Sequence, residues 1–192
     1  MGQMAMQQDD LVDAAAHFRR AVDTATAIND PDLLAFGHLA MARWYDRYGD
    51  ARASQNMLEG AMNLYHHWGS QRMSLNTRAL MMNRAVRLFT QRGMHTRSAG
   101  ILTSLKNMAE SSGLATVRCR ALWAEASVLG TMARYDQARA LLKEGQQLAA
   151  EHGLVALGLE IRREDAAIAL DAGDYQDVID TCRVEGSRNL RV

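Results

Sequence analysis

The middle of the chain holds the residues best suited to chemistry, because the interval between Glu59 and Glu110 contains basic side chains and no acid. Amide and guanidinium groups on one helix face can hold the backbone and the carboxylates of a peptide. The side chains that recur at spacings of seven, four and three, and so share a helix face, are Asn76, Asn83, Arg87 and Thr90. The arginines of this basic band are Arg72, Arg78, Arg84, Arg87, Arg92 and Arg97. This pattern predicts a site for an acidic peptide or another anion.

The charge of the whole chain predicts no partner, since 22 basic residues balance 22 acidic ones. Salt screens electric fields beyond about 8 Å, so a local basic band can act although the total is zero. Two interpretations of the band stay open at this point. Its arginines form a solvated helix face or pair with acids of adjacent repeats, or they bind an anion.

Two acids are candidates for catalysis, because Glu125 and Asp165 stand forty residues apart and occupy matching places in successive repeats. A pair of carboxylates can act as general acid and base. Acids near a repeat junction usually meet a basic residue, and we expect Arg118, Arg162 or Arg163 to be that partner. We therefore predict no catalytic residue and no enzymatic activity.

The histidine pair His66-His67 is the candidate for metal binding. Adjacent residues on a helix point about 100° apart, so both rings cannot easily hold one ion. The sequence also lacks a glycine-rich phosphate loop, a nucleophile elbow and the spacing of Cys/His ligands. We expect neither a metal nor a cofactor.

The two cysteines, Cys119 and Cys182, lie far apart inside apolar helical patterns, and we expect reduced core thiols. No stretch approaches the roughly 20 uncharged apolar residues needed to span a bilayer. The first residues lack the basic and apolar blocks of a secretory signal. These observations predict a cytoplasmic location and no membrane contact.

The elements that must position these residues are helices, because Ala, Leu, Met and Arg dominate the chain and favour helix. Glycines and short polar pairs interrupt the helical patterns, where Gly ends one helix and Asp or Ser caps the next. Pro31 suits the first turn of a helix. The expected helices are 10–28, 31–48, 51–68, 71–92, 95–112, 114–133, 135–152, 154–172 and 175–184.

The breaks between helices are periodic. One series, Asn29, Gly69, Gly113 and Gly153, has spacings of 40, 44 and 40 residues, and the alternate series, Gly49, Gly93, Ala133 and Gly173, has spacings of 44, 40 and 40. A helical hairpin that leaves an apolar face must stack on its neighbours to bury it. We therefore predict an all-α fold, a right-handed α-solenoid of about nine helices in antiparallel pairs. A single repeat domain is expected over 1–192, with units at about 10–29, 30–69, 70–113, 114–153 and 154–185.

The pattern resembles the tetratricopeptide repeat, which places a small and an aromatic residue before Gly-Asp-Tyr and then Ala and a large apolar residue. The best match is at Ala42, Tyr45, Gly49, Asp50, Leu58 and Ala61. The period departs from the usual 34 residues, the closing proline is absent, and Glu125 and Asp165 replace apolar residues. The chain therefore looks more like the long tetratricopeptide-like repeats of maltose-activator-type bacterial regulators, with a HEAT-type or other helical solenoid as the alternative.

The resemblance implies that the first helix of each unit lines a concave peptide-binding groove. Residue by residue, the implied contact positions are Leu39, Arg43, Asp46, Asn83, Arg87, Thr90, Trp123 and Ser127. Asn and Arg would hold the peptide's polar groups, and Trp123 would be an apolar anchor.

We therefore predict a protein-interaction or regulatory scaffold that binds a peptide or a partner helix, with signal transduction or transcription regulation as the context. Nucleic-acid or anion binding through the basic band is the first alternative, against which the neutral total charge speaks. Homo-oligomerisation is the second alternative. Neither expected end of the solenoid carries a polar capping helix, so we expect a fragment of a longer protein or pairing of ends between chains.

Overall fold

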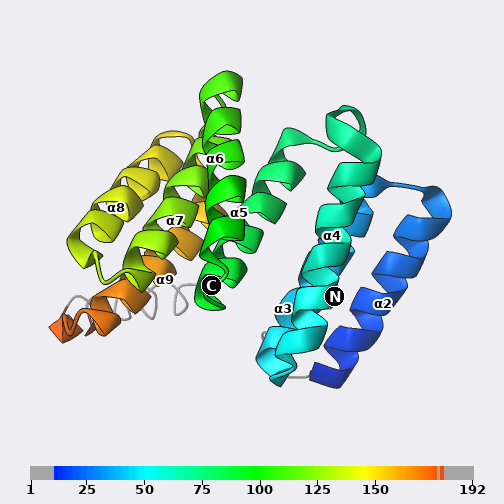
Figure 1. The fold of residues 1–192 in the computed structure, drawn as a ribbon, viewed down its shortest axis with the longest axis horizontal. Helices are drawn as coiled ribbons and strands as arrows, with labels where there is room; N and C mark the ends of the chain where they lie inside the picture. Colours follow the sequence, from blue (N-terminus) through cyan, green and yellow to red (C-terminus); the bar gives the residue numbers. More distant parts are fainter. Residues whose placement is uncertain (1–10, 177, 180–192) are drawn as a thin grey trace. The chain divides into compact units, whose positions relative to one another are not determined.

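The computed structural model describes the backbone of residues 11–176, 178 and 179, and the side chains of that part except at 11–15 and 68–71. This part of the chain is all-helical (Figure 1), which confirms the predicted fold class. Its eight helices are α2 Leu11–Ile28, α3 Pro31–Tyr48, α4 Ala51–Arg72, α5 Leu75–Gln91, α6 His95–Ser112, α7 Ala115–Thr131, α8 Tyr135–Glu151 and α9 Val155–Asp171. The ninth expected helix, 175–184, lies mostly outside the described residues.

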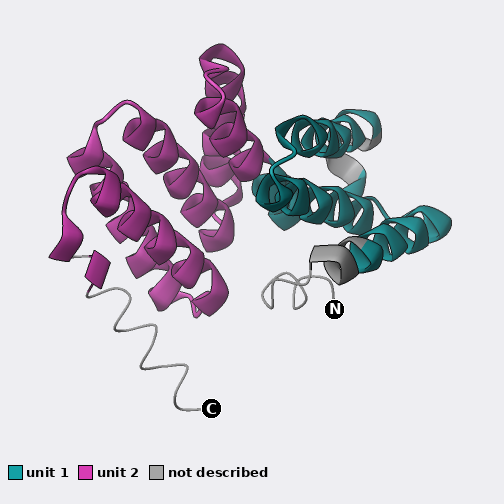
Figure 2. Ribbon diagram, turned by 90° about the horizontal axis from the view of Figure 1, so that it is seen from below, with its two compact units in different colours: residues 1–81 teal, residues 82–192 magenta. Residues whose placement is uncertain are grey.

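Consecutive helices pack as hairpins, with contacts between α2 and α3, α3 and α4, α6 and α7, α7 and α8, and α8 and α9. Helix α7 also contacts α9, so the first helices of two successive hairpins lie against each other. The chain divides into two compact units, residues 1–81 and 82–192, and the boundary falls within α5 (Figure 2). Among the described helices, none has the length and apolar character needed to cross a membrane.

The same turn closes most of the helices. After α3, Gly49 takes a φ of +88°, its N–H donates to the carbonyl of Asp46, and the N–H of Asp50 donates to the carbonyl of Tyr45. This left-handed cap satisfies carbonyls that the helix end leaves free. The side chain of Asp50 then accepts the N–H of Ala53 and caps α4. The repeated Gly-Asp and Asn-Asp pairs of the sequence therefore join one helix to the next.

One predicted break is wrong. Helix α4 continues through Gly69 to Arg72, and the chain turns at Met73, whose φ and ψ are −112° and 135°. A glycine inside a helix costs only about 1 kcal/mol, and the cap that starts the next helix lies further on. The hydroxyl of Ser74 accepts the N–H of Thr77 at 3.2 Å and caps α5.

This correction makes the repeat more regular. The breaks at Asn29, Met73, Gly113 and Gly153 now stand 44, 40 and 40 residues apart. These spacings equal those of the alternate series from Gly49 to Gly173. One offset therefore relates equivalent residues of both helices in each hairpin, 44 residues for the first step and 40 for the next two.

Each unit has its own core. In the first unit, Phe18, Met41 and Trp44 form a buried cluster. In the second unit, the cluster contains Trp123, Leu142 and Ile161, together with Cys119, Ala126, Ala138, Ala149, Leu157 and Ile168. Cys119 is a free, fully buried thiol whose S–H donates to the carbonyl of Gly145 at 3.5 Å. Cys182 lies outside the described residues.

Candidate functional site

The predicted contact positions fall in both compact units. Helix α3 of the first unit carries Arg43 and Asp46, which are exposed, and Leu39, which is buried. Helices α5 and α7 carry the positions from Asn83 to Ser127, which lie in the second unit. The second unit brings most of its positions together on one face of α5, α7 and α9, which we call the first-helix face.

Asn83 joins two first helices. Its side chain is 1% exposed, and its amide nitrogen Nδ2 donates to the backbone carbonyl of Arg120 at 2.9 Å. Because a helix carbonyl can accept a second hydrogen bond, this contact leaves α7 intact while it holds α5 against it. The structure therefore places Asn83 at the α5–α7 contact.

Arg87 lies at the centre of a cluster that joins three helices. Its Nη2 atom lies 2.6 Å from Oε2 of Glu164 on α9, and its guanidinium lies over the ring of Trp123, 4.4 Å from the centroid. The hydroxyl of Ser127 donates to Oε1 of Glu164 at 2.8 Å and also lies 3.1 Å from the carbonyl of Trp123. We call these four residues, Arg87, Trp123, Ser127 and Glu164, the Arg87 cluster.

Trp123 differs from the expected anchor. The indole is only 6% exposed, because the guanidinium of Arg87 lies over it and the core of the second unit surrounds it. Thr90 also differs, since its hydroxyl is buried and pairs with the hydroxyl of Ser98 on α6 at 2.6 Å. It therefore stabilises the α5–α6 hairpin.

The first-helix face carries more hydrogen-bonding capacity than its own contacts use. Within the described part of the chain, four buried N–H donors have no hydrogen-bond partner: Nε of Arg87, Nε and Nη1 of Arg120, and Nε1 of Trp123. The buried acceptor Oδ1 of Asn83 has none either. Burial lowers the pKa of Arg120, and the carboxylate of Glu160 acts in the opposite direction. A buried polar group without a partner costs about 1–3 kcal/mol.

Sequence reasoning missed Arg120, Glu160 and Glu164. A signal was present, since Arg120 and Glu160 occupy the same repeat position forty residues apart with opposite charge. Glu164 follows one helical turn later, on the same face as Glu160. Opposite charges at matching positions of neighbouring first helices predict a contact across them.

The basic band is divided between the two compact units, with Arg72 and Arg78 in the first and the other four arginines in the second. Arg78 lies over the ring of Tyr65, 5.4 Å from its centroid, and Arg97 lies over Phe89 at 4.3 Å. The ion pair of Arg87 with Glu164 agrees with the interpretation that these arginines pair with acids of adjacent repeats.

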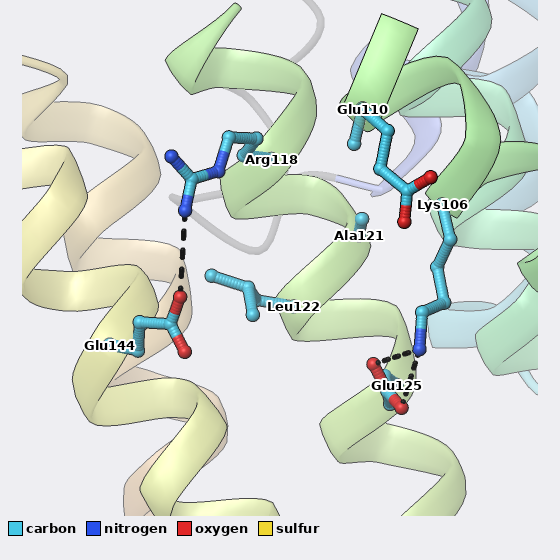
Figure 3. A pocket seen from close by; sticks show the side chains of 8 residues that line it. Lys106, Glu110, Arg118, Ala121, Leu122, Glu125 and Glu144 are labelled. Carbon is cyan, nitrogen blue, oxygen red and sulfur yellow. Dashed lines mark hydrogen bonds and ion pairs between the residues drawn. The ribbon is translucent and has the colours of Figure 1, made fainter. Parts of the chain in front are cut away.

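The acids that were candidates for catalysis are paired with cations on separate helices. Nζ of Lys106 lies 2.9 Å from both carboxylate oxygens of Glu125 at one side of a small pocket between α6, α7 and α8 (Figure 3). The pocket has a volume of about 140 Å³, and Arg118 faces Glu144 across 3.7 Å at its other side (Figure 3). The predicted partner Arg118 is therefore wrong for Glu125.

Asp165 also has a different partner from the one expected. Nε of Arg139 on α8 donates to its Oδ1 at 3.2 Å, in place of Arg162 or Arg163. The reason is geometric, because α8 and α9 form a hairpin contact, whereas the two arginines follow α9's own turn. Among the described residues, no group of three His, Cys, Asp or Glu side chains could hold a metal ion.

Comparison with known proteins identifies the fold. No family model matches the chain, and no curated protein matches it. Among solved structures, the chain is similar to BtubC (BKLC) from P. vanneervenii, with 20% sequence identity, 98% of this chain and 78% of that chain covered, and a TM-score of 0.62. At this identity the likeness shows the fold alone, which is a helical repeat.

Proposed function

We propose that this protein is an interaction scaffold that binds a peptide segment of another protein on the first-helix face of its second unit. The observation that carries the proposal is the surplus of unpartnered polar atoms on that face, four N–H donors and one acceptor. Buried polar groups of a purely structural interface are almost all paired.

The chemistry of these groups fits a peptide. An extended peptide offers a carbonyl acceptor and an N–H donor at each residue, which complements guanidinium and indole donors and the amide oxygen of Asn83. Trp and Arg are also the residue types that contribute most to binding at protein interfaces. The proposal assigns binding, and no catalysis, to this part of the chain.

The test uses a displayed library of random peptides, selected on the immobilised full chain. We expect Arg87→Ala to weaken the selected peptides by about tenfold or more, because Arg is a common source of binding energy. Isothermal titration calorimetry with the synthetic peptides gives the affinities.

Lys143→Ala is the matched control, since it also removes one positive charge and Lys143 is exposed on α8. Its affinity should stay within about twofold of the wild-type value. Equal affinities for wild type, Arg87→Ala and Lys143→Ala would remove the first-helix face as the binding surface. Binding of oligonucleotides with a steep salt dependence, and of no peptide, would favour the basic band instead.

A further inference from the structure

The Arg87 cluster already contains a carboxylate, which belongs to the protein itself. Glu164 on α9 receives Nη2 of Arg87 from α5 at 2.6 Å and the hydroxyl of Ser127 from α7 at 2.8 Å. A guanidinium and a hydroxyl that converge on two carboxylate oxygens form a receptor for that group. The structure therefore shows how this face holds a carboxylate.

The ion pair in this receptor is accessible from solvent. The side chains of Arg87 and Glu164 are 26% and 16% exposed, while Trp123 beneath the guanidinium is 6% exposed. Ion pairs that water reaches are weaker than fully buried ones, because solvent screens the charges. A carboxylate from outside can therefore compete for Arg87.

The contact with Glu164 leaves other donors unused. Nε of Arg87 and Nε1 of Trp123 remain without a partner among the described residues, as do two N–H groups of Arg120. Glu164 is fixed to α9 and its two oxygens are taken, so it cannot reach these donors as well. A peptide with an acidic side chain brings a carboxylate for Arg87 and backbone carbonyls for the remaining donors.

We propose that Arg87 receives an acidic side chain of the bound peptide, and that Glu164 occupies this receptor in the free protein as an internal competitor. This inference rests on the proposed function and adds the chemistry of the ligand and an internal limit on its affinity. Removal of the Glu164 carboxylate frees Arg87 and strengthens binding, whereas removal of Arg87 abolishes the gain.

The experiment compares the affinity of fluorescein-labelled acetylated hexaglutamate for the wild-type chain and for Glu164→Gln, by fluorescence anisotropy at low salt. We expect Glu164→Gln to bind about tenfold more tightly, a factor typical of one charge-assisted hydrogen bond. Ser127→Ala should give a smaller increase, because it removes only one of the two contacts that hold Glu164. Labelled hexaglutamine should bind neither protein more tightly than the other.

Two controls separate this effect from a change in net charge. Glu144→Gln removes the same charge from α8, where Glu144 pairs with Arg118, and should change the affinity by less than about twofold. The double variant Arg87→Gln/Glu164→Gln should lose the increase entirely. Circular dichroism verifies the fold of each variant, and Ser127→Ala carries the test if Glu164→Gln does not fold.

The outcomes distinguish this inference from the proposed function. Equal affinities of Glu164→Gln and Glu144→Gln for hexaglutamate would overturn the internal competitor, while library-selected peptides that depend on Arg87 would still support a peptide scaffold. An increase that persists in the double variant would also overturn it. A larger gain for a labelled oligothymidylate than for hexaglutamate would assign the freed site to nucleic acid and overturn the acidic-peptide ligand.

Discussion

His38 on α3 gives the first unit a pH-dependent stability. Its ring lies against α4, where a Cβ on Gly60 would be 3.3 Å from Nδ1, and its Nδ1 has no partner among the described residues. Burial lowers the pKa of His38 below its ordinary value of 6.5. The unfolded chain then binds the proton at a higher pH than the folded chain, so stability falls as the pH drops below about 6.5.

The measurement is the urea midpoint of the wild type and of His38→Gln at pH 7.5 and pH 5.5. We expect the stability of the wild type relative to the variant to be greater at pH 7.5. His152→Gln, at an exposed position after α8, should show no such difference between the two pH values. A relative stability of His38→Gln that does not change with pH would contradict the assigned role of burial.

Gly37 and Gly100 form a matched pair for helix packing. A Cβ on Gly37 would lie 2.5 Å from Cγ2 of Val22 on α2, whereas a Cβ on Gly100 would meet nothing within 4 Å. Val22 has a stiff, β-branched side chain, so Gly37→Ala should destabilise the protein by about 1–2 kcal/mol. Gly100→Ala should stabilise it by up to about 1 kcal/mol, because Ala favours helix. Thermal midpoints test both, and a stabilising Gly37→Ala would show that α2 can move away.

The residues of the candidate site were partly predictable from the sequence. The spacing and the resemblance selected Asn83, Arg87, Trp123 and Ser127, and the structure brings these onto one face. The sequence alone did not show that Glu164 fills the space beside Arg87. That contact joins residues 77 positions apart, and only the correct repeat offset places α9 within reach of α5.

At the scale of the elements, Ser74 determines where α5 begins. Its hydroxyl caps Thr77, and its N–H donates to Oδ1 of Asp32 at 3.0 Å, which holds the start of α5 near the start of α3. Ser74→Ala removes the cap and should cost about 1 kcal/mol of stability. Ser104→Ala, on the exposed side of α6, should change the urea midpoint by little. Equal effects of the two substitutions would argue against the cap.

The helices were predictable because their ends carry local signals, such as Pro31 with Asp30 at the start of α3 and Gly49 at its end. The break at Gly69 was wrong because glycine alone does not end a helix, and the decisive cap at Ser74 joins Asp32 from 42 residues earlier. Local signals therefore set most helix ends, while a contact between helices set this one.

At the scale of the whole molecule, the repeat offset explains which residues correspond. Leu39, Asn83 and Trp123 share one position of the first helix, and all three are buried. The structure thus uses one position for apolar packing in the first unit and for polar and aromatic contacts in the second. A change of residue type at a fixed repeat position is where the second unit acquires its candidate site.

The division into two compact units predicts uneven effects of a core mutation. Ile161 on α9 is fully buried in the core cluster of the second unit, so Ile161→Ala should cost about 2–5 kcal/mol. Each hairpin of a repeat protein is stabilised mainly by its neighbours, so the loss should be local.

Native-state hydrogen exchange measures this locality. We expect Ile161→Ala to lower amide protection in α7 and α8, which contact each other and lie next to α9 in the hairpin order, more than in α3 and α4 of the first unit. Leu39→Ala should produce the reverse pattern, because Leu39 is buried on α3. Equal losses of protection in all four helices for both variants would mean that the two compact units unfold as one cooperative structure, with coupling carried through α5, which spans their boundary.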